Sequence, residues 1–379
     1  MKPRILCISF SDIRRDARVL RQLDVLSRFG NVTTLSYGSK PDAAADHIEI
    51  DSSLPSLPQT VLGVVKLLLR RFHSVALQAP ATRAAVAKLG ACEYDIVVAN
   101  EARALPLAFE VAGRPRIWCD LHEWAPAERT HVLSWRLLVA PFMHWVCAEY
   151  LPRVDAATTI NESIGSLYAE QFGVETEIVR NARPLVAELV PSETSDRIRL
   201  VHSGGAVPGR NIEAIIEAVD ILGDGYSLDL YLIPSRQGDA YWQQLLRRIE
   251  RSPHTTLHPA VAPDELPAVL NPYDLGVFLL PPHTPNHRLM LPNKFFDFVQ
   301  ARLGMVFGSS LETDRLITEH SLGLITPGYT AADLVEALRS ANREQIESFK
   351  RASADVAAAM SSDADIAVEE SILRRLSAA

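Results

Sequence analysis

The first half of the chain alternates short apolar runs with stretches in which apolar residues recur every three or four positions. Continuous apolar runs predict strands that are buried on both faces, and the recurrence predicts helices packed over them. The clearest helix is residues 15–30, which ends at Gly30. The predicted strands are residues 4–10, 31–37, 94–100, 116–122, 155–161 and 176–182.

The second half repeats this alternation. Its predicted strands are residues 198–204, 227–233, 255–261, 274–280 and 304–308, with helices over 211–222, 240–252, 264–273 and from Phe295 onward. Strands that alternate with helices predict two doubly wound α/β domains with parallel sheets, whose ligands gather at the carboxyl ends of the strands.

The domain boundaries follow from breaks in these patterns. Residues 183–196 show neither period and contain turn residues, so we expect a linker there. The tail, residues 363–376, is an amphipathic helix. We therefore expect an N-terminal domain over 1–183, a C-terminal domain over 184–360, and a helix within 361–379 that crosses back to the first domain.

Length and composition agree with this division and exclude some functions. A chain of 379 residues exceeds what one hydrophobic core usually serves. The net charge of −8 argues against a nucleic-acid binder. The four cysteines lie far apart without a CxxC pair, so we expect neither a zinc site nor disulfides, and a reducing cytoplasm fits.

Two apolar stretches, residues 61–75 and 132–146, raise the question of a membrane. Neither offers about eighteen clean apolar residues, so we expect no membrane span. Each stretch either docks shallowly on a membrane surface or packs as a helix beneath a domain, and we expect the packed helix. The apolar run 5–10 is too short for a signal peptide.

A lysine stands where a helix begins in "LPNKFFDFVQARLGMVF", residues 291–307. Pro292 suits a first helical turn and Asn293 is a good cap, so the helix is expected to start at residues 292–294. Its free N–H groups and Lys294 together form a candidate phosphate site. The alternative is a surface lysine on a solvated turn.

A second candidate phosphate site lies in "HSGGAVPGRNIEAII", residues 202–216, between a strand and a helix. Gly204, Gly205 and Gly209 allow close backbone approach, and Arg210 stands at the helix start. The alternative is a glycine-rich turn that packs helix on strand. Because both sites follow parallel strands, we expect Arg210 and Lys294 to converge and to hold a diphosphate.

Charged residues also follow the first strand, where they are expected to face the cleft between the domains. Arg15 and Arg18 are candidates for contact with a phosphate or an acidic acceptor, and Asp12 lies beside them. Ordinary charge on a helix surface is the alternative. Asn161 ends another strand at the same edge.

The ordered series "YDIVVAN", "DLHEW", "ATTINESIGSLYAEQFGVETEIVRNARP", "SGGAVPGRNIEAIIEAVDIL" and "LPNKFFDFVQARLGMVF" resembles the retaining GT-B glycosyltransferases of family 4. The resemblance covers nearly the whole chain. It implies two Rossmann-like domains facing across a cleft, with the nucleotide-sugar donor on the C-terminal domain and the acceptor on the other. It also implies that neither a metal nor a cofactor is needed.

The resemblance carries roles over to individual positions. Arg210 and Lys294 match phosphate ligands, and Asp297 stands where the family has a Glu that holds the ribose hydroxyls. His122 stands where the family has an active-site His, whose neutral imidazole would contact the donor sugar or the acceptor. Asp120 or Glu123 would orient that ring, or they cap the next helix.

One departure concerns the donor sugar. The first of the family's two glutamates falls on Leu289, so main-chain N–H groups from His287 to Leu291 would have to bind the sugar instead. Residues 258–266 are expected to flank the nucleotide base.

The implied reaction is transfer of a sugar from a nucleotide diphosphate sugar to a hydroxyl group with retained configuration. The acceptor would be a saccharide or a lipid-linked molecule in bacterial polysaccharide or glycolipid assembly. The protein would then lie in the cytoplasm, with peripheral contact to the inner face of the membrane. The alternatives are a nonhydrolysing sugar-nucleotide epimerase and a noncatalytic nucleotide-sugar-binding partner.

Overall fold

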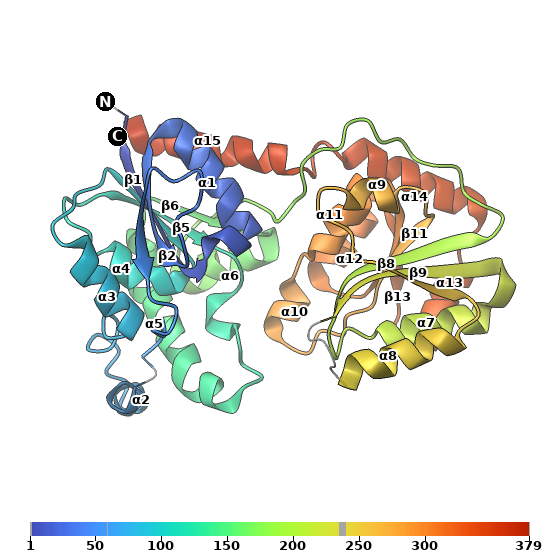
Figure 1. Cartoon of the computed structure of the whole chain (residues 1–379), viewed down its shortest axis with the longest axis horizontal. Coiled ribbons are helices and arrows are strands. Elements are labelled where there is room, and N and C mark those ends of the chain that lie inside the picture. Colours follow the sequence, from blue (N-terminus) through green and yellow to red (C-terminus); the bar gives the residue numbers. More distant parts are fainter. Residues whose placement is uncertain (1, 59, 235–239, 379) are drawn as a thin grey trace. The chain divides into compact units, whose positions relative to one another are not determined.

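The computed structural model describes residues 2–58, 60–234 and 240–378, and it divides into two compact units (Figure 1). The N-terminal unit comprises Met1–Arg180, Thr284–Asn286 and Asp365–Ala379. The C-terminal unit comprises Asn181–His283 and His287–Ala364. Each unit contains one parallel sheet with helices on both faces, so the prediction of two doubly wound α/β domains is confirmed.

The sheet of the N-terminal unit has seven strands in the order β3-β2-β1-β4-β5-β6-β7. The strands are β1 (Arg4–Asp12), β2 (Asn31–Tyr37), β3 (Asp46–Ile50), β4 (Ile96–Asn100), β5 (Arg116–Leu121), β6 (Ala156–Thr159) and β7 (Glu177–Ile178). The order reverses direction between β1 and β4, and such a switch point is where ligands usually bind in doubly wound sheets. The sequence analysis missed β3, because "DHIEI" alternates polar and apolar residues at the sheet edge.

The helices of this unit are α1 (Ala17–Phe29), α2 (Val61–Leu68), α3 (Pro80–Leu89), α4 (Leu105–Ala108), α5 (Ala140–Tyr150), α6 (Glu162–Phe172) and most of α15 (Ser362–Ala378). The side chains of Ile372, Leu373 and Leu376 on α15 pack in the same core cluster as α1 and β1. The C-terminal helix thus completes the cover of the N-terminal sheet.

The sheet of the C-terminal unit has six strands in the order β10-β9-β8-β11-β12-β13. They are β8 (Ile198–Ala206), β9 (Tyr226–Pro234), β10 (Thr255–His258), β11 (Leu275–Phe278), β12 (Gly304–Gly308) and β13 (Gly323–Thr326). The strand order reverses between β8 and β11. The sequence analysis assigned no element after residue 308 until the tail, and it therefore missed β13 and three helices.

Alternate residues of these strands enter two different cores. Leu200 and Val306 pack against α7 (Ile212–Leu222) and α13 (Ala331–Arg339), while Val201 packs on the other face. The further helices are α8 (Ala240–Arg251), α9 (Leu266–Leu270), α10 (Pro285–Leu289), α11 (Asn293–Gln300), α12 (Leu311–His320) and α14 (Arg343–Val356). Figure 1 shows α7, α8 and α13 on one face of the sheet, and α9, α11 and α14 on the other.

The two apolar stretches have different environments. Residues around Phe142 and Val146 on α5 are buried, as expected. Helix α2 is packed on one face only: Gly63 and Leu67 are buried, but Val61 and Leu62 are 87% and 62% exposed. The expectation that residues 61–75 pack beneath the domain is therefore wrong for the outer face of α2. Among the described residues, no helix combines the length and the apolar character needed to cross a bilayer.

Candidate functional site

A cavity of about 490 Å³ opens in the C-terminal unit at the switch point between β8 and β11. Ser203 and Gly204 of β8 and Phe278 of β11 bring the strand ends to it, and Lys294 enters from the start of α11. Much of the remaining lining is apolar and comprises Tyr231, Ile233, Ala260, Val261, Pro263 and Leu266. Four of these residues belong to the 258–266 segment that was expected to flank a base.

Arg210 and Lys294 converge on one point of this cavity. A Cβ atom built at Gly204 would lie 2.5 Å from Lys294 Nζ and 3.7 Å from Arg210 Nη1. Gly204 also has a φ of +120°, which side-chain-bearing residues rarely adopt. A side chain at this position would displace at least the lysine ammonium, so glycine lets both cations approach the end of β8.

The positive charge in this cavity is only partly neutralised. Lys294 is buried, with its ammonium 5.2 Å from the centre of the Phe278 ring. Burial and the neighbouring Arg210 lower the pKa of Lys294 to about 8, against the opposing effect of Asp297. Burial likewise lowers the pKa of Arg210. A bound anion would relieve both costs.

His202, which precedes the cavity residue Ser203 in β8, is held neutral. Burial, Lys294 and Arg210 lower its pKa to about 3, although its ring Nδ1 donates to the carbonyl of Val277 at 2.8 Å. A neutral ring at this position adds no third positive charge. The sequence analysis did not single out His202, because a histidine inside a strand gives no signal of its neighbours.

Asp297 lines the cavity but already has a partner. Its Oδ1 lies 2.5 Å from Arg183 Nε, and the side chain is buried. Burial raises the pKa of Asp297, while Arg183 and Lys294 lower it. The Asp297 carboxylate, which the resemblance assigned to the ribose hydroxyls, thus forms an ion pair with Arg183. Arg183 was missed, because it lies in an irregular segment that was interpreted as the end of the first domain.

The remaining predicted donor residues occupy varied positions. Asn293 lines the cavity beside Pro292, which precedes α11. The carbonyl of Gly205 accepts from Arg210 Nη1 at 3.2 Å, and Gly209 has a φ of +85° in the turn before Arg210. The side chain of Leu291 packs in the core of the unit, so only its main chain remains for a ligand.

A cluster of charged side chains lies at the strand ends of the N-terminal unit. His122 Nε2 is 3.1 Å from Asp120 Oδ2, and His122 Nδ1 is 3.1 Å from Glu101 Oε1. Burial would lower the pKa of His122, but the two carboxylates raise it to about 10. The expected neutral imidazole is therefore wrong: the ring is an imidazolium held between two carboxylates.

Glu101 is a further functional candidate that sequence reasoning missed. It directly follows β4, and its backbone has a φ of 73°. A glutamate in this region is strained, and such strain concentrates at functional sites. Despite burial, which acts in the other direction, His122 lowers the pKa of Glu101, so the carboxylate is charged. The sequence offered only its place after a predicted strand.

Two predicted acceptor residues form a buried structural pair instead. Arg18 Nη2 is 2.6 Å from Asp120 Oδ1, and Arg18 Nη1 donates to the carbonyl of Val179 at 2.7 Å. Both side chains are buried, and Asp120 also accepts from Thr158 Oγ1 at 2.6 Å. The expectation that Arg18 meets a phosphate or an acidic acceptor is wrong, because burial and pairing with Asp120 occupy its guanidinium. Asp120 instead orients the His122 ring, which was one of its two expected roles, since Asp120 Oδ2 also lies 3.1 Å from His122 Nε2.

The other predicted acceptor residues also have local partners. Asn161 is buried and its Oδ1 accepts from the N–H of Ile164 at 2.9 Å, so it caps α6 rather than facing a ligand. The exposed Arg15 lies 3.5 Å from Asp12. Burial and the nearby Glu101 raise the pKa of Glu123 to about 8, and Glu123 neither orients His122 nor caps a helix.

The two Rossmann-like units give this chain the GT-B fold, which solved glycosyltransferase structures share. The cationic cavity lies at the switch point of the second unit. The chain is similar to sucrose-phosphate synthase from Thermosynechococcus elongatus, with a TM-score of 0.70, 14% identity and 99% of each chain covered. It is also similar to HepE from Anabaena in complex with UDP, with a TM-score of 0.69, 13% identity and coverage of 99% and 100%. No protein-family model matches the chain, and no curated protein is significantly similar to it in sequence.

Proposed function

We propose that this chain is a glycosyltransferase that moves a sugar from a nucleotide diphosphate sugar to a hydroxyl acceptor. The observation that supports it is the convergence of Arg210 and Lys294 on Gly204 in a cavity of about 490 Å³. That volume is in the usual range for small-molecule sites. A bound diphosphate would supply negative charge that neutralises both Arg210 and Lys294. HepE binds UDP and UDP-glucose, which favours a uridine donor.

The chemistry proposed is stabilisation of the leaving diphosphate. As the glycosidic bond to the donor breaks, negative charge grows on the phosphate oxygens, and the guanidinium and ammonium groups bind them more strongly than in the ground state. The N–H groups at the start of α11 add a partial positive charge. These groups would replace a metal ion. Retention, with a donor phosphate oxygen taking the acceptor proton, follows from the resemblance to family 4.

We assign the acceptor to the N-terminal unit, with Glu101 and His122 as its candidate contacts. Both ring nitrogens of His122 already lie beside carboxylates, so the ring cannot accept a proton from a hydroxyl group. We therefore propose that His122 positions Glu101. A role in bacterial polysaccharide or glycolipid assembly is proposed on the same resemblance.

The proposal is tested by nucleotide binding followed by product analysis. In a thermal-shift screen, one nucleoside diphosphate and the nucleotide sugars that contain it should raise the unfolding midpoint, since a ligand stabilises the state that binds it. Arg210→Met should abolish this shift, while Arg343→Met, at an exposed arginine of the same unit, should retain it. No shift with any nucleotide, or an unchanged shift in Arg210→Met, would refute the donor site.

Product analysis then separates the candidate reactions. Incubation with the binding donor and an acceptor panel should give a glycoside whose anomeric proton, read by NMR, keeps the donor's configuration. Release of an epimerised nucleotide sugar would instead indicate an epimerase, and binding without turnover would indicate a noncatalytic protein. Activity should be unchanged by EDTA, and loss of activity restored by a divalent cation would contradict the metal-independent mechanism.

A further inference from the structure

Helix α2 turns an apolar face outward. Its exposed residues Val61, Leu62, Val65 and Leu68 recur at the spacing of one helical face, whereas Gly63 and Leu67 on the opposite face are buried. A surface helix of a soluble domain normally shows the reverse arrangement. The apolar face is therefore unpartnered within the described chain.

A second segment extends this face. Helix α2 packs against the π-helical turn Trp135–Val139. Phe72, which follows α2, contacts Trp145 of α5, with ring centroids 5.9 Å apart and the rings tilted. Leu133 and Leu137 are 59% and 55% exposed. We call the six most exposed large apolar residues of both segments the apolar ridge: Val61, Leu62, Leu68, Leu69, Leu133 and Leu137. Figure 1 shows α2 at the periphery of its own unit.

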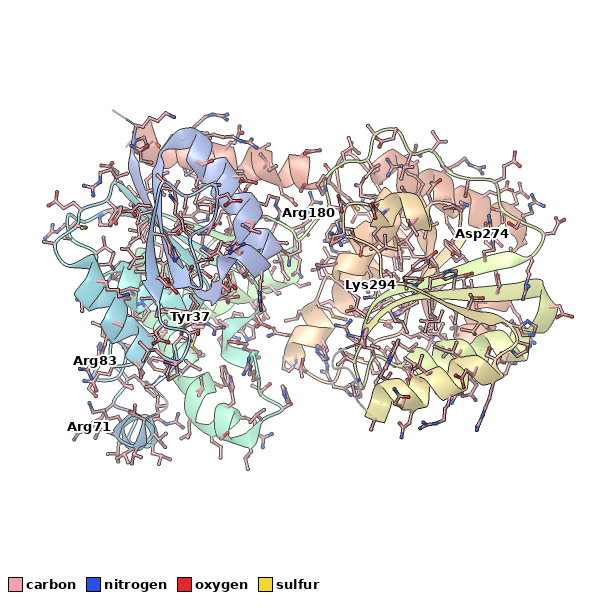
Figure 2. All side chains as sticks on the ribbon, in the orientation of Figure 1. Tyr37, Arg71, Arg83, Arg180, Asp274 and Lys294 are labelled. Atoms are coloured by element: carbon pink, nitrogen blue, oxygen red, sulfur yellow. The ribbon has the colours of Figure 1, made fainter. Side chains whose placement is uncertain are left out.

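The two segments that carry the apolar ridge contain basic but no acidic residues. The chain contains 46 acidic residues and has a net charge of −8, yet neither residues 52–92 nor residues 129–148 include a single Asp or Glu. Exposed Arg70 and Arg71 follow Leu69, the C-cap of α2, and exposed Arg136 lies between Leu133 and Leu137. Figure 2 shows Arg71 beside α2. An acidic protein thus has two segments of purely basic charge that also carry a run of exposed apolar residues.

We infer that the apolar ridge docks on the surface of a membrane that contains anionic lipids. Apolar residues on one face of a helix, flanked by arginines, are the features by which interfacial helices bind bilayers. Each basic residue near an anionic surface adds about 1 kcal/mol, which multiplies binding by about fivefold. Because neither segment contains a carboxylate, the residues that would lie at the membrane do not themselves repel anionic lipids. The inference does not depend on the proposed reaction.

The test is flotation of the full chain with lipid vesicles. The wild type should float with phosphatidylcholine vesicles that contain about 30 mol % phosphatidylglycerol, and much less with pure phosphatidylcholine or in high salt. Leu62→Glu/Leu68→Glu should weaken binding by at least about tenfold, because it removes apolar area and adds negative charge. Arg70→Gln/Arg71→Gln/Arg136→Gln should weaken it by about two orders of magnitude.

The matched control is Leu311→Glu, since Leu311 is 60% exposed, nearly as much as Leu68 at 61%, and lies in the other unit. This variant should float like the wild type. Every variant should keep the wild-type thermal midpoint, which separates lost docking from misfolding. A wild type that does not float with anionic vesicles, or ridge variants that float equally well, would overturn the inference. A wild-type dimer that Leu62→Glu/Leu68→Glu dissociates, without vesicle binding, would assign the ridge to a second copy instead.

Discussion

Replacing Lys294 by Met should weaken nucleotide binding while it stabilises the free protein. Lys294 is buried beside Arg210, and its pKa falls from 10.5 to about 8. That difference corresponds to about 3 kcal/mol of lost preference for the charged form. Met preserves most of the side-chain volume and removes the charge. A lysine kept only for stability would not be held at such a cost.

The size of the binding effect follows from the contact that is lost. A hydrogen bond between an ammonium and a phosphate contributes about 1.5–3 kcal/mol, so Lys294→Met should weaken binding of the nucleoside diphosphate by roughly 10- to 150-fold. Isothermal titration calorimetry at pH 7 measures this. The unfolding midpoint of the free variant should be a few degrees higher than that of the wild type.

The pH dependence has a defined sign. Because the folded protein binds the lysine proton more weakly than the unfolded chain, this group makes stability rise as the pH increases from about 8 to 10.5. Lys294→Met should lack this contribution. At about pH 8.5, binding of a diphosphate to the wild type should take up protons, because the anion raises the pKa of the lysine.

Lys350 provides the control, since it is also buried but has an anionic partner. Its Nζ lies 3.6 Å from Asp274 Oδ1 and donates to the carbonyl of Tyr273 at 2.9 Å. Lys350→Met should therefore destabilise the protein by about 3–5 kcal/mol, because it leaves Asp274 buried with less compensation. The reasoning would be refuted if Lys294→Met also destabilised the protein and left nucleotide binding unchanged.

Three further outcomes are expected. Gly204→Ala should weaken nucleotide binding by about tenfold or more in calorimetry, because its methyl group would lie 2.5 Å from the lysine ammonium. The control Gly223→Ala should bind normally, since Gly223 has a φ of +73° but no atom within 4 Å of the added methyl. Equal losses in both variants would indicate backbone strain alone. Asp120→Asn should lower the free energy of unfolding in urea by about 3–5 kcal/mol, because it leaves Arg18 buried with a neutral partner, and a change below about 1 kcal/mol would contradict a buried ion pair. The NMR signals of His122 should remain those of an imidazolium from pH 6 to 9, since its pKa is about 10. The contribution of His122 to the free energy of unfolding is complete below pH 6.5 and is lost as the pH rises through 10. A transition of the NMR signals near pH 6.5 would refute the assignment.

Local patterns in the sequence were enough to predict the α/β class and both candidate phosphate sites. The start of α11 at Asn293 and the bounds of β2 and β12 depend on residues within a turn or a strand of one another, so their periodicity and caps reveal them. The convergence of Arg210 and Lys294 was predictable because parallel strands end at one edge of a sheet.

The partners of individual side chains could be found only from the tertiary structure. Arg18 meets Asp120 across 102 residues, and Arg183 meets Asp297 across 114 residues. Which strand ends become neighbours depends on strand order, and whether a charge is buried depends on helices from elsewhere in the chain. The strained backbone of Glu101 and the outward apolar face of α2 are likewise absent from the local pattern, because the same residues would also suit an ordinary turn and a packed helix.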